Sequence, residues 1–184
     1  EGSVGVKEDY ETIITELILA DLDTLSKINE KTLRTDTVLS SAVTKLRMHM
    51  NTGLPARTAL LTRGEEAVVI QLSLLTSKPE IMVLNVSEDS YSESKFDAVI
   101  AEYSKILGME KSNMVVVSAK IESELAELGD EDAKEYLKEL GVERSGLERL
   151  IQKAYEKLGL MSFLTCGEKE VRAWTIKIGA TAVE

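Results

Sequence analysis

The sequence predicts an α/β protein, built around a partial parallel sheet that is interrupted by a helical hairpin. Two apolar runs, at 80–86 and 113–118, have the length of strands, and an amphipathic run at 94–107 separates them. A strand, a crossover helix and a second strand form the repeating unit of parallel sheets. Upstream of this unit, two segments with the apolar spacing of a helix predict the hairpin.

The hairpin is predicted from apolar residues that recur three and four positions apart. The first helix is expected over 9–33, Thr35 and Asp36 supply a tight turn or a cap, and Gly53 and Pro55 end the second helix. The apolar positions are Ile14, Ile18, Leu22 and Leu25 in the first helix and Leu39, Val43, Leu46 and Met50 in the second. We expect an antiparallel pair that buries its stripe only against itself and projects from its parent domain as an arm.

Further helices and strands follow from periodicity and from turn residues. Ser145 and Glu148 have the spacing of a capping box. The expected helices are 65–75, 122–128, 130–140 and 145–158, with Gly129, Gly141 and Gly159 between or after the last three, and the last strands are 161–165 and 171–176. The chain therefore ends in strands that follow a helical stretch.

Polar motifs follow the two strands of the parallel unit. The sequence IMVLNVSE occupies 81–88, and VVVSAKIE occupies 115–122. Ligands of parallel sheets gather outside the carboxyl ends of the strands. In GTP-binding domains the pair at these ends is Asn-Lys-x-Asp and Ser-Ala-Lys, and the Asp carboxylate accepts two hydrogen bonds from guanine. Here Val86 replaces Lys and Glu88 replaces Asp, so the pattern predicts a base-reading site with altered selectivity.

These motifs, with further segments in the same order, resemble the Obg-like ATPases, also called the YchF family, of the translation-factor class of P-loop NTPases. The further segments are TELILADL (15–22), LPAR (54–57), LLTSKP (74–79), SELAEL (123–128), SGLERLI (145–151) and GEKEVRAWTI (167–176). Ordered matches over most of the chain make the resemblance specific. It implies the second half of a G-domain-like parallel sheet with a helical, coiled-coil-like insertion, followed by the start of a β-grasp (TGS) domain.

The resemblance also implies a division of the chain. The expected parts are the G domain at 1–18, the helical insertion at 19–75, the C-terminal half of the nucleotide-binding G domain at 76–160 and the TGS start at 161–184. The family's phosphate loop, G-x-x-x-x-G-K-[ST], does not occur in the sequence. We therefore expect a central fragment of a longer protein, without catalytic residues of its own and unable to hydrolyse nucleotide alone.

For the intact protein, the resemblance implies ATP, or GTP, with Mg²⁺ as cofactor. Water would attack the γ-phosphate, and the phosphate and metal ligands would come from outside this chain. The expected partners are nucleotide and the ribosome or RNA, the latter contacted through the helical arm and the TGS region. No membrane and no DNA partner is expected.

The first half of the predicted base site is Asn85, Val86 and Glu88. The amide of Asn85 would orient the base and tie the loops together, or it would simply hold a turn. Val86 lacks the stem and ammonium of Lys, so we expect its backbone to contact the base. Glu88 is one methylene longer than Asp, and a displaced carboxylate loses the paired N–H donors of guanine, which favours tolerance of ATP. The alternative for Glu88 is a solvated acid.

The second half of the predicted site is Ser118, Ala119 and Lys120. They would close the other side of the base through backbone N–H groups and the lysine stem. A small residue and a lysine after a strand are common, so this motif gains its meaning from the pairing with NVSE. The alternative is that Lys120 is a solvated flank of the next helix.

The net charge of the chain restricts the partners that it is expected to bind. The chain has 22 basic and 32 acidic side chains and a net charge of −10, which disfavours nonspecific binding to a polyanion. Contact with a ribosome would need a local basic patch. Lys169, Arg172 and Lys177 are candidates, although Glu168 and Glu170 dilute them, and a solvated face is the plainer interpretation.

Several other features exclude classes of protein. The apolar runs are shorter than the ~18 residues of a membrane span, and the acidic first residues lack the apolar core of a secretion signal, so a cytoplasmic location is expected. Cys166 is the only cysteine and His49 the only histidine. Neither an internal disulfide nor a histidine metal cluster is therefore expected.

Three functions remain open on the sequence. The first is an ATP-preferring, ribosome-associated NTPase, for which this chain would supply the base-reading motifs and the arm. The second is a non-catalytic module that binds protein or ribosome through the arm and the TGS start. The third is a short non-catalytic relative of the family.

Overall fold

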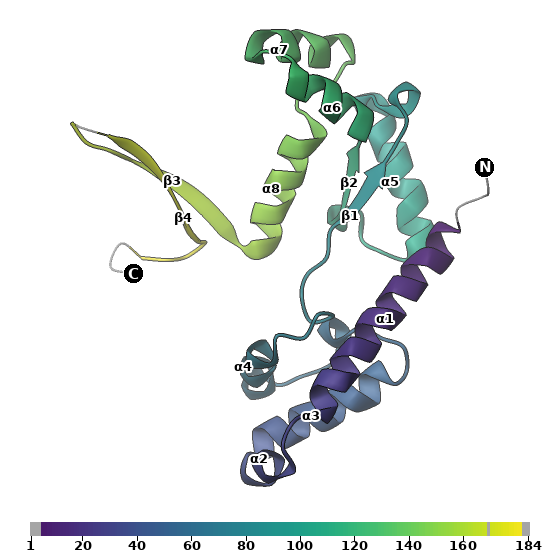
Figure 1. Cartoon of the computed structure of the whole chain (residues 1–184), viewed down its shortest axis with the longest axis vertical. Coiled ribbons are helices and arrows are strands. Elements are labelled where there is room, and N and C mark those ends of the chain that lie inside the picture. Colours follow the sequence, from purple (N-terminus) through teal and green to yellow (C-terminus); the bar gives the residue numbers. More distant parts are fainter. Residues whose placement is uncertain (1–4, 169, 182–184) are drawn as a thin grey trace. The chain divides into compact units, whose positions relative to one another are not determined.

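The chain forms two compact units, Glu1–Pro79 and Glu80–Glu184. A computed structural model describes residues 5–168 and 170–181 (Figure 1). Lys169, one of the candidate basic residues, lies outside the described residues.

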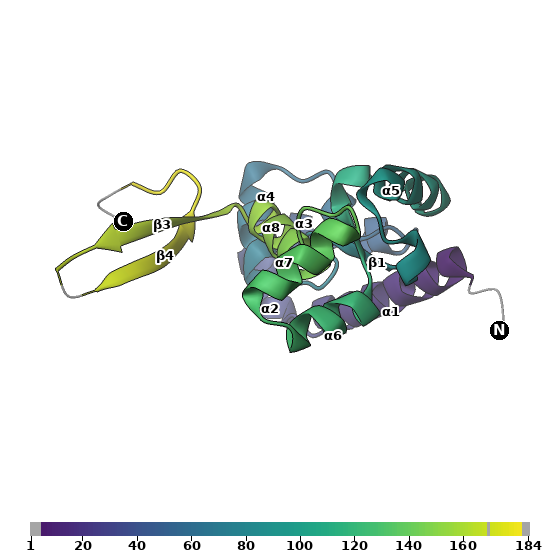
Figure 2. The ribbon, with the colours of Figure 1, turned by 90° about the horizontal axis from the view of Figure 1, so that it is seen from above.

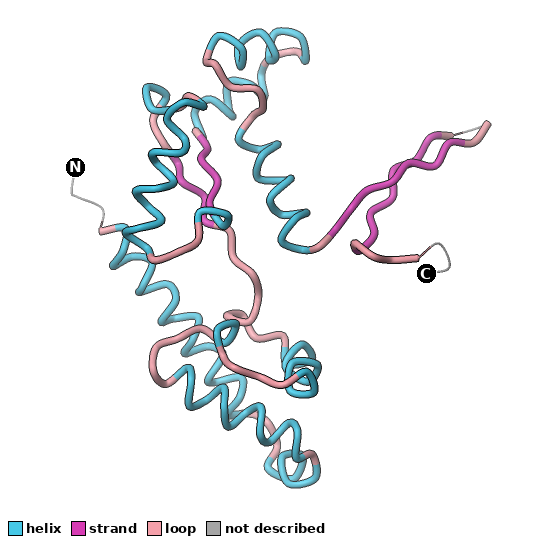
Figure 3. Tube along the Cα trace, turned by 180° about the vertical axis from the view of Figure 1, so that it is seen from behind, coloured by secondary structure: helices cyan, strands magenta, loops and turns pink. Residues whose placement is uncertain are grey.

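Helices dominate both units. The α-helices are α1 (Val6–Ser26), α2 (Glu30–Thr35), α3 (Thr37–Met50), α4 (Arg63–Leu72), α5 (Glu93–Leu107), α6 (Ala119–Glu127), α7 (Asp130–Glu139) and α8 (Gly146–Leu158). The strands are β1 (Met82–Asn85), β2 (Met114–Val117), β3 (Leu160–Cys166) and β4 (Val171–Lys177), and the short 3-10 helices are η1 (Ala56–Thr58), η2 (Glu88–Ser90) and η3 (Lys111–Asn113). The described strands form two separate pairs (Figure 3).

The first unit contains the two long helices that the sequence predicts, but the connection between them is not a tight turn. A separate helix, α2, lies between α1 and α3. The side chain of Asn29 accepts a hydrogen bond from the N–H of Lys31 and begins α2, so the first helix ends at Ser26 rather than near residue 33. Asp36, expected at a turn or cap, caps α3 by accepting the N–H of Leu39 at 2.9 Å.

The apolar side chains of the two hairpin helices are not buried against each other alone, contrary to the prediction. Ile18 and Leu25 of α1 share one apolar cluster with Leu46 of α3, with Val69 of α4 and with Leu74 beyond it. Burying these side chains together is the main stabilising contribution available to the unit. Helix α4 and the segment after it therefore complete the core that α1 and α3 begin.

The second unit contains the predicted parallel strands. β1 pairs with β2 in parallel, with Leu84 opposite Val116 and Asn85 opposite Val117, and α5 connects the two strands. This arrangement confirms the α/β class. Strand β1 is buried on one face only, because Val83 is 42% exposed while Leu84 is 6% exposed. Within the described residues β1 has a strand neighbour on one side only.

The remainder of the second unit follows the sequence closely. The Ser145–Glu148 capping box is present at the start of α8. Gly141 and Gly159 adopt positive φ, where glycine is favoured, whereas Gly129 has φ −72° and begins α7 instead of ending a helix. β3 and β4 form an antiparallel ribbon in which Phe163 lies opposite Trp174 (Figure 2).

Candidate functional site

A direct hydrogen bond joins the two strand-end motifs. The side-chain oxygen Oδ1 of Asn85, the last residue of β1, accepts the backbone N–H of Ala119 at 2.9 Å. Ala119 is the first residue of α6, so the bond links the end of one strand to the helix that follows the other. Both residues are exposed. The structure thus brings together two motifs that lie far apart in the sequence.

The residues beside this bond differ in what they leave available to a ligand. The N–H of Val86 donates to the carbonyl of Val117 at 2.9 Å and extends the strand ladder, so a base contact through this N–H would have to displace a sheet bond. Ser118 is buried, and within the described part of the chain its hydroxyl has no hydrogen-bond partner. A buried hydroxyl without a partner is unusual, because such groups are normally satisfied.

Glu88 and Lys120 form an ion pair across the same edge. The Nζ of Lys120 lies 2.5 Å from Oε2 of Glu88 and 3.8 Å from Oε1 of Glu124. The pKa of Lys120 is raised by the hydrogen bond that it donates to Glu88 and by the negative charges of Glu88 and Glu124. The lysine is therefore fully charged at neutral pH. All six predicted site residues lie at or just beyond the carboxyl ends of β1 and β2.

A second polar network supports the edge, and sequence reasoning missed its role. The carboxylate of Glu122 in α6 accepts the N–H groups of Gly146 at 2.6 Å and Leu147 at 3.2 Å, at the start of α8. It also accepts the hydroxyl of Tyr91 at 3.4 Å, and Arg149 donates to the same hydroxyl at 3.1 Å. A carboxylate at a helix N-terminus is stabilised by the free N–H groups and by the helix dipole.

No local signal in the sequence points to this network. Glu122 follows Ser118 by one helical turn, and Arg149 lies in the SGLERLI segment, but a cap supplied by a different helix leaves no fixed spacing. A cross-helix cap of this kind can be found only from the fold.

Arg149 also closes the side of β2 that faces away from β1. The carbonyl of Val117 points toward β1, since it accepts the N–H of Val86, and successive carbonyls of a strand point to opposite sides. The carbonyl of Val116 therefore points outward, and Arg149 donates to it at 2.8 Å. The guanidinium also lies 4.4 Å from the ring centre of Phe96.

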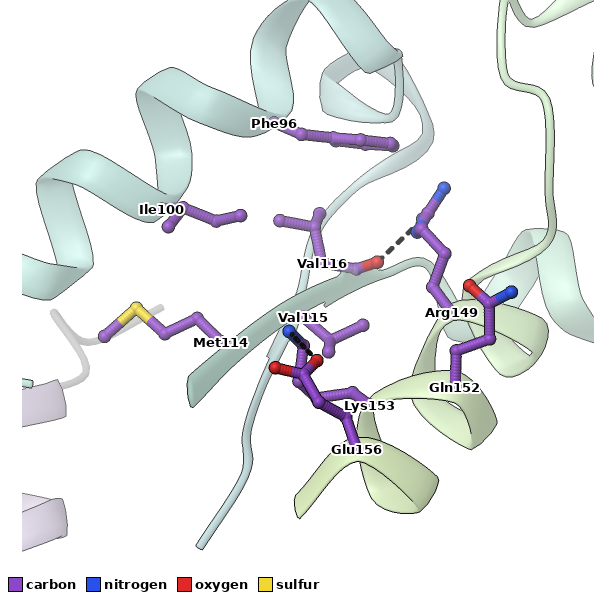
Figure 4. Close-up of a pocket in the computed structure, with 9 residues that line it drawn as sticks. All are labelled: Phe96, Ile100, Met114, Val115, Val116, Arg149, Gln152, Lys153 and Glu156. Carbon is purple, nitrogen blue, oxygen red and sulfur yellow. Dashed lines mark hydrogen bonds and ion pairs between the residues drawn. The ribbon is translucent and has the colours of Figure 1, made fainter. Parts of the chain in front are cut away.

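A cavity of about 260 Å³ adjoins Arg149 (Figure 4). It is lined by Phe96 and Ile100 of α5, by Met114, Val115 and Val116 of β2, and by Arg149, Gln152, Lys153 and Glu156 of α8. Of its polar groups, Arg149 donates to the carbonyl of Val116, and Lys153 pairs with Glu156. The cavity lies between α5, β2 and α8.

The other residues singled out in the sequence have simple surroundings. His49 lies 2.7 Å from the hydroxyl of Thr58, and Cys166 is a free, exposed thiol at the end of β3. The described residues contain no group of three or more His, Cys, Asp or Glu side chains placed to hold a metal ion. Among the helices described, none has the length and apolarity to cross a bilayer.

The chain is similar over its whole length to curated bacterial proteins. It is 40% identical over 190 residues to the "Ribosome-binding ATPase YchF" of Bacillus subtilis, covering 100% of this chain and 52% of the relative. It is 38% identical over 192 residues to the protein of the same name from Escherichia coli O157:H7, covering 98% and 51%. The chain thus spans about half the length of these relatives. No family model matches it.

A comparison with a solved structure shows that the fold, too, is similar to that of a YchF protein. The Schizosaccharomyces pombe YchF GTPase superposes with a TM-score of 0.80 at 28% identity, covering 99% of this chain and 52% of that one. The parallel β1–β2 pair and this match therefore define an α/β protein of the GTPase fold class. Within that class, the chain belongs to the YchF family.

Proposed function

We propose that this chain supplies the base-binding side of the nucleotide site in a ribosome-associated P-loop NTPase that prefers ATP to GTP. The observation that carries the proposal is the Asn85–Ala119 hydrogen bond, which joins the two strand-end motifs at one edge of a parallel sheet. Such an edge is where ligands of α/β sheets bind. Glu88, in place of the Asp that reads guanine, supports the preference for ATP.

The names of the relatives support the remaining parts of the proposal. Proteins called ribosome-binding ATPase match the whole of this chain, so we propose ribosome binding, a cytoplasmic location and ATP with Mg²⁺ as cofactor for the full-length protein. The phosphate-binding loop of the family does not occur in this sequence, so we assign no step of hydrolysis to its residues. Their part is to hold and select the base.

The domain assignment is likewise proposed from the family. Residues 1–18 and 76–160 would belong to the G domain, 19–75 to the helical insertion and 161–184 to the start of a TGS domain. The continuous helix α1 crosses residue 18, so the first boundary would fall inside a helix. Separate expression of residues 76–160 and 19–75, followed by measurement of their folding, tests the boundaries.

Calorimetry on the full-length protein encoded by the gene that carries this sequence tests the nucleotide site. We expect ATP to bind at least as tightly as GTP, and Asn85→Ala to weaken both, because the tie between the two loops is lost. Asn51→Ala is the matched control, since Asn51 is an exposed residue that follows α3 in the other unit. A strong preference for GTP, or unchanged binding in Asn85→Ala, would contradict the proposal.

A second function is favoured by the exposed apolar surface of the β3–β4 ribbon. Leu164 is 72% exposed and Val171 is 66% exposed, and contiguous exposed apolar side chains often mark a binding surface. The chain would then act as a non-catalytic module for protein or ribosome binding. Cosedimentation with ribosomes separates the two functions. If the chain acts as a non-catalytic binding module, Leu164→Ser should reduce ribosome binding in the absence of nucleotide. If its function is base binding, Leu164→Ser should leave ribosome binding unchanged. Leu128→Ser is the control.

A further inference from the structure

The Glu88–Lys120 pair occupies the carboxylate that would otherwise read the base. Glu88 begins η2 immediately beyond β1, and Lys120 is the second residue of α6 beyond β2. Their side chains meet with an Nζ–Oε2 distance of 2.5 Å. The pair therefore spans the two loops on the edge where the base would bind.

The position of Lys120 is set by more than one contact. Glu124, one turn later in α6, lies 3.8 Å from the lysine, and the hydroxyl of Tyr136 donates to Glu124 at 2.6 Å. The ammonium thus lies between two carboxylates, of which Glu88 is the nearer. The Lys120 and Glu88 side chains remain 67% and 42% exposed, so a ligand can reach the pair.

The pair bears directly on which base can be read. A carboxylate that selects guanine must accept two N–H groups of the ring, and an ammonium bound to the same carboxylate competes for those lone pairs. Adenine does not present these paired donors, so its binding does not depend on a free carboxylate. The ion pair would therefore weaken the binding of GTP and leave the binding of ATP unchanged.

We propose that Lys120 is a specificity-determining residue, which removes guanine preference by holding the carboxylate of Glu88. This inference rests on the proposed function, because it presumes that ATP binds at this edge. It differs from an explanation by side-chain length alone, in which Glu88 would fail to read guanine whether or not Lys120 were present.

The test measures the ratio of the dissociation constants for GTP and ATP. Calorimetry of the full-length protein with non-hydrolysable analogues of both nucleotides and Mg²⁺ gives this ratio. Lys120→Met keeps the aliphatic stem and removes the ammonium, so we expect the ratio to fall on the order of fivefold in favour of GTP, the upper range for releasing an exposed ion pair. Lys120→Arg keeps a cation at Glu88 and should leave the ratio near that of the natural protein.

Two controls isolate the pair. Lys153→Met removes an ion pair of similar length, Lys153–Glu156 at 2.8 Å, away from the strand ends and should not change the ratio. Higher salt should lower the ratio for the natural protein but not for Lys120→Met, because salt screens exposed pairs. The phosphates are common to both nucleotides, so screening of their charge cancels in the ratio.

The outcomes distinguish this inference from the proposed function. An unchanged ratio in Lys120→Met, or an equal loss of both nucleotides, overturns the role of Lys120 while leaving ATP binding intact. If the natural protein binds neither nucleotide, the proposed function itself fails and this inference with it. A selective gain for GTP supports both.

Discussion

Two carboxylates, Asp21 in the first unit and Glu88 in the second, are used in opposite ways. In the first unit Asp21 is 1% exposed, and it accepts the N–H groups of Leu75 at 2.6 Å and Thr76 at 2.7 Å, as well as the Thr76 hydroxyl at 2.6 Å. In the second unit, Glu88 is exposed and meets a single flexible lysine. The first carboxylate is surrounded by fixed donors, whereas the second is open to solvent.

This difference separates polar groups that hold the fold from polar groups that are free to meet a ligand. A buried charge is tolerated only when hydrogen bonds replace the water it has lost, so Asp21 belongs to the architecture. An exposed pair contributes little to stability, so the position of Glu88 and Lys120 at the strand ends needs another explanation. Substitutions of both kinds of polar group test this difference.

The largest effect is expected for Asp21→Ala. The change would remove the acceptor of the Leu75 and Thr76 N–H groups and of the Thr76 hydroxyl, and we expect the free energy of unfolding to fall by about 3 kcal/mol. Urea unfolding followed by circular dichroism measures it. Asp23→Ala is the control, because Asp23 lies on the same helix and pairs only with exposed Lys27. Equal losses of unfolding free energy in the two variants would mean that Asp21 stabilises the fold no more than an exposed carboxylate does.

A smaller loss is expected for Gly146→Ala, at the cap of α8. A Cβ there would lie 2.9 Å from both Glu122 Oε1 and Val117 Cγ1, and we expect a cost of about 2 kcal/mol from this crowding. Gly64→Ala is the matched control near the start of α4, where the added Cβ would meet only Val38 at 3.8 Å. A stable Gly146→Ala with intact structure would mean that the contact between α6 and α8 is loose.

A pH-dependent loss is expected for Glu65→Gln. Lys45, the N–H of Thr62 and the hydroxyl of Ser41 hold the pKa of Glu65 at about 2, below its ordinary value of 4.5. Because the folded-state pKa is lowered, the contribution of the charge is complete above pH 4.5 and disappears as the pH falls toward 2.

Thermal unfolding across this pH range checks the sign. The melting temperature of Glu65→Gln should lie below that of the natural protein at neutral pH, and the gap should narrow in acid. Glu66→Gln, on the exposed side of the same turn, should show no such gap. A difference in melting temperature that widens in acid would contradict the lowered pKa of Glu65.

The smallest effect on stability is expected for Lys120→Met. The melting temperature should match that of the natural protein, because the Glu88–Lys120 pair is exposed and exposed ion pairs contribute little to stability. A marked loss of stability would place the pair among the structural contacts and weaken its assignment to base selection.

The sequence predicted the regular elements of this fold well where local physics decides them. Apolar periodicity located α3, α5 and α8, and the positions of Gly159 and Asp36 marked a helix end and a helix start. The extra helix α2 was missed, because its six residues carry too few apolar positions to show a period. The packing of α4 on the hairpin was missed because periodicity reveals an apolar face but not its partner.

The candidate site was predictable only in part. The strand-end rule located Asn85 and Lys120 at one edge. The direction of the Lys120 side chain toward Glu88, and the use of the Val86 N–H in the ladder, depend on register between strands about thirty residues apart. Glu122 was overlooked, because its partners belong to a helix that begins more than twenty residues later.

Arg149 has a consequence for assembly. A strand arriving beside β2 would find the outward carbonyl of Val116 already bonded and a guanidinium in its path, which is how edge strands avoid unwanted pairing. No such guard is seen along the outer edge of β1 in the described residues. A further strand could pair beside β2 only if Arg149 left the carbonyl of Val116.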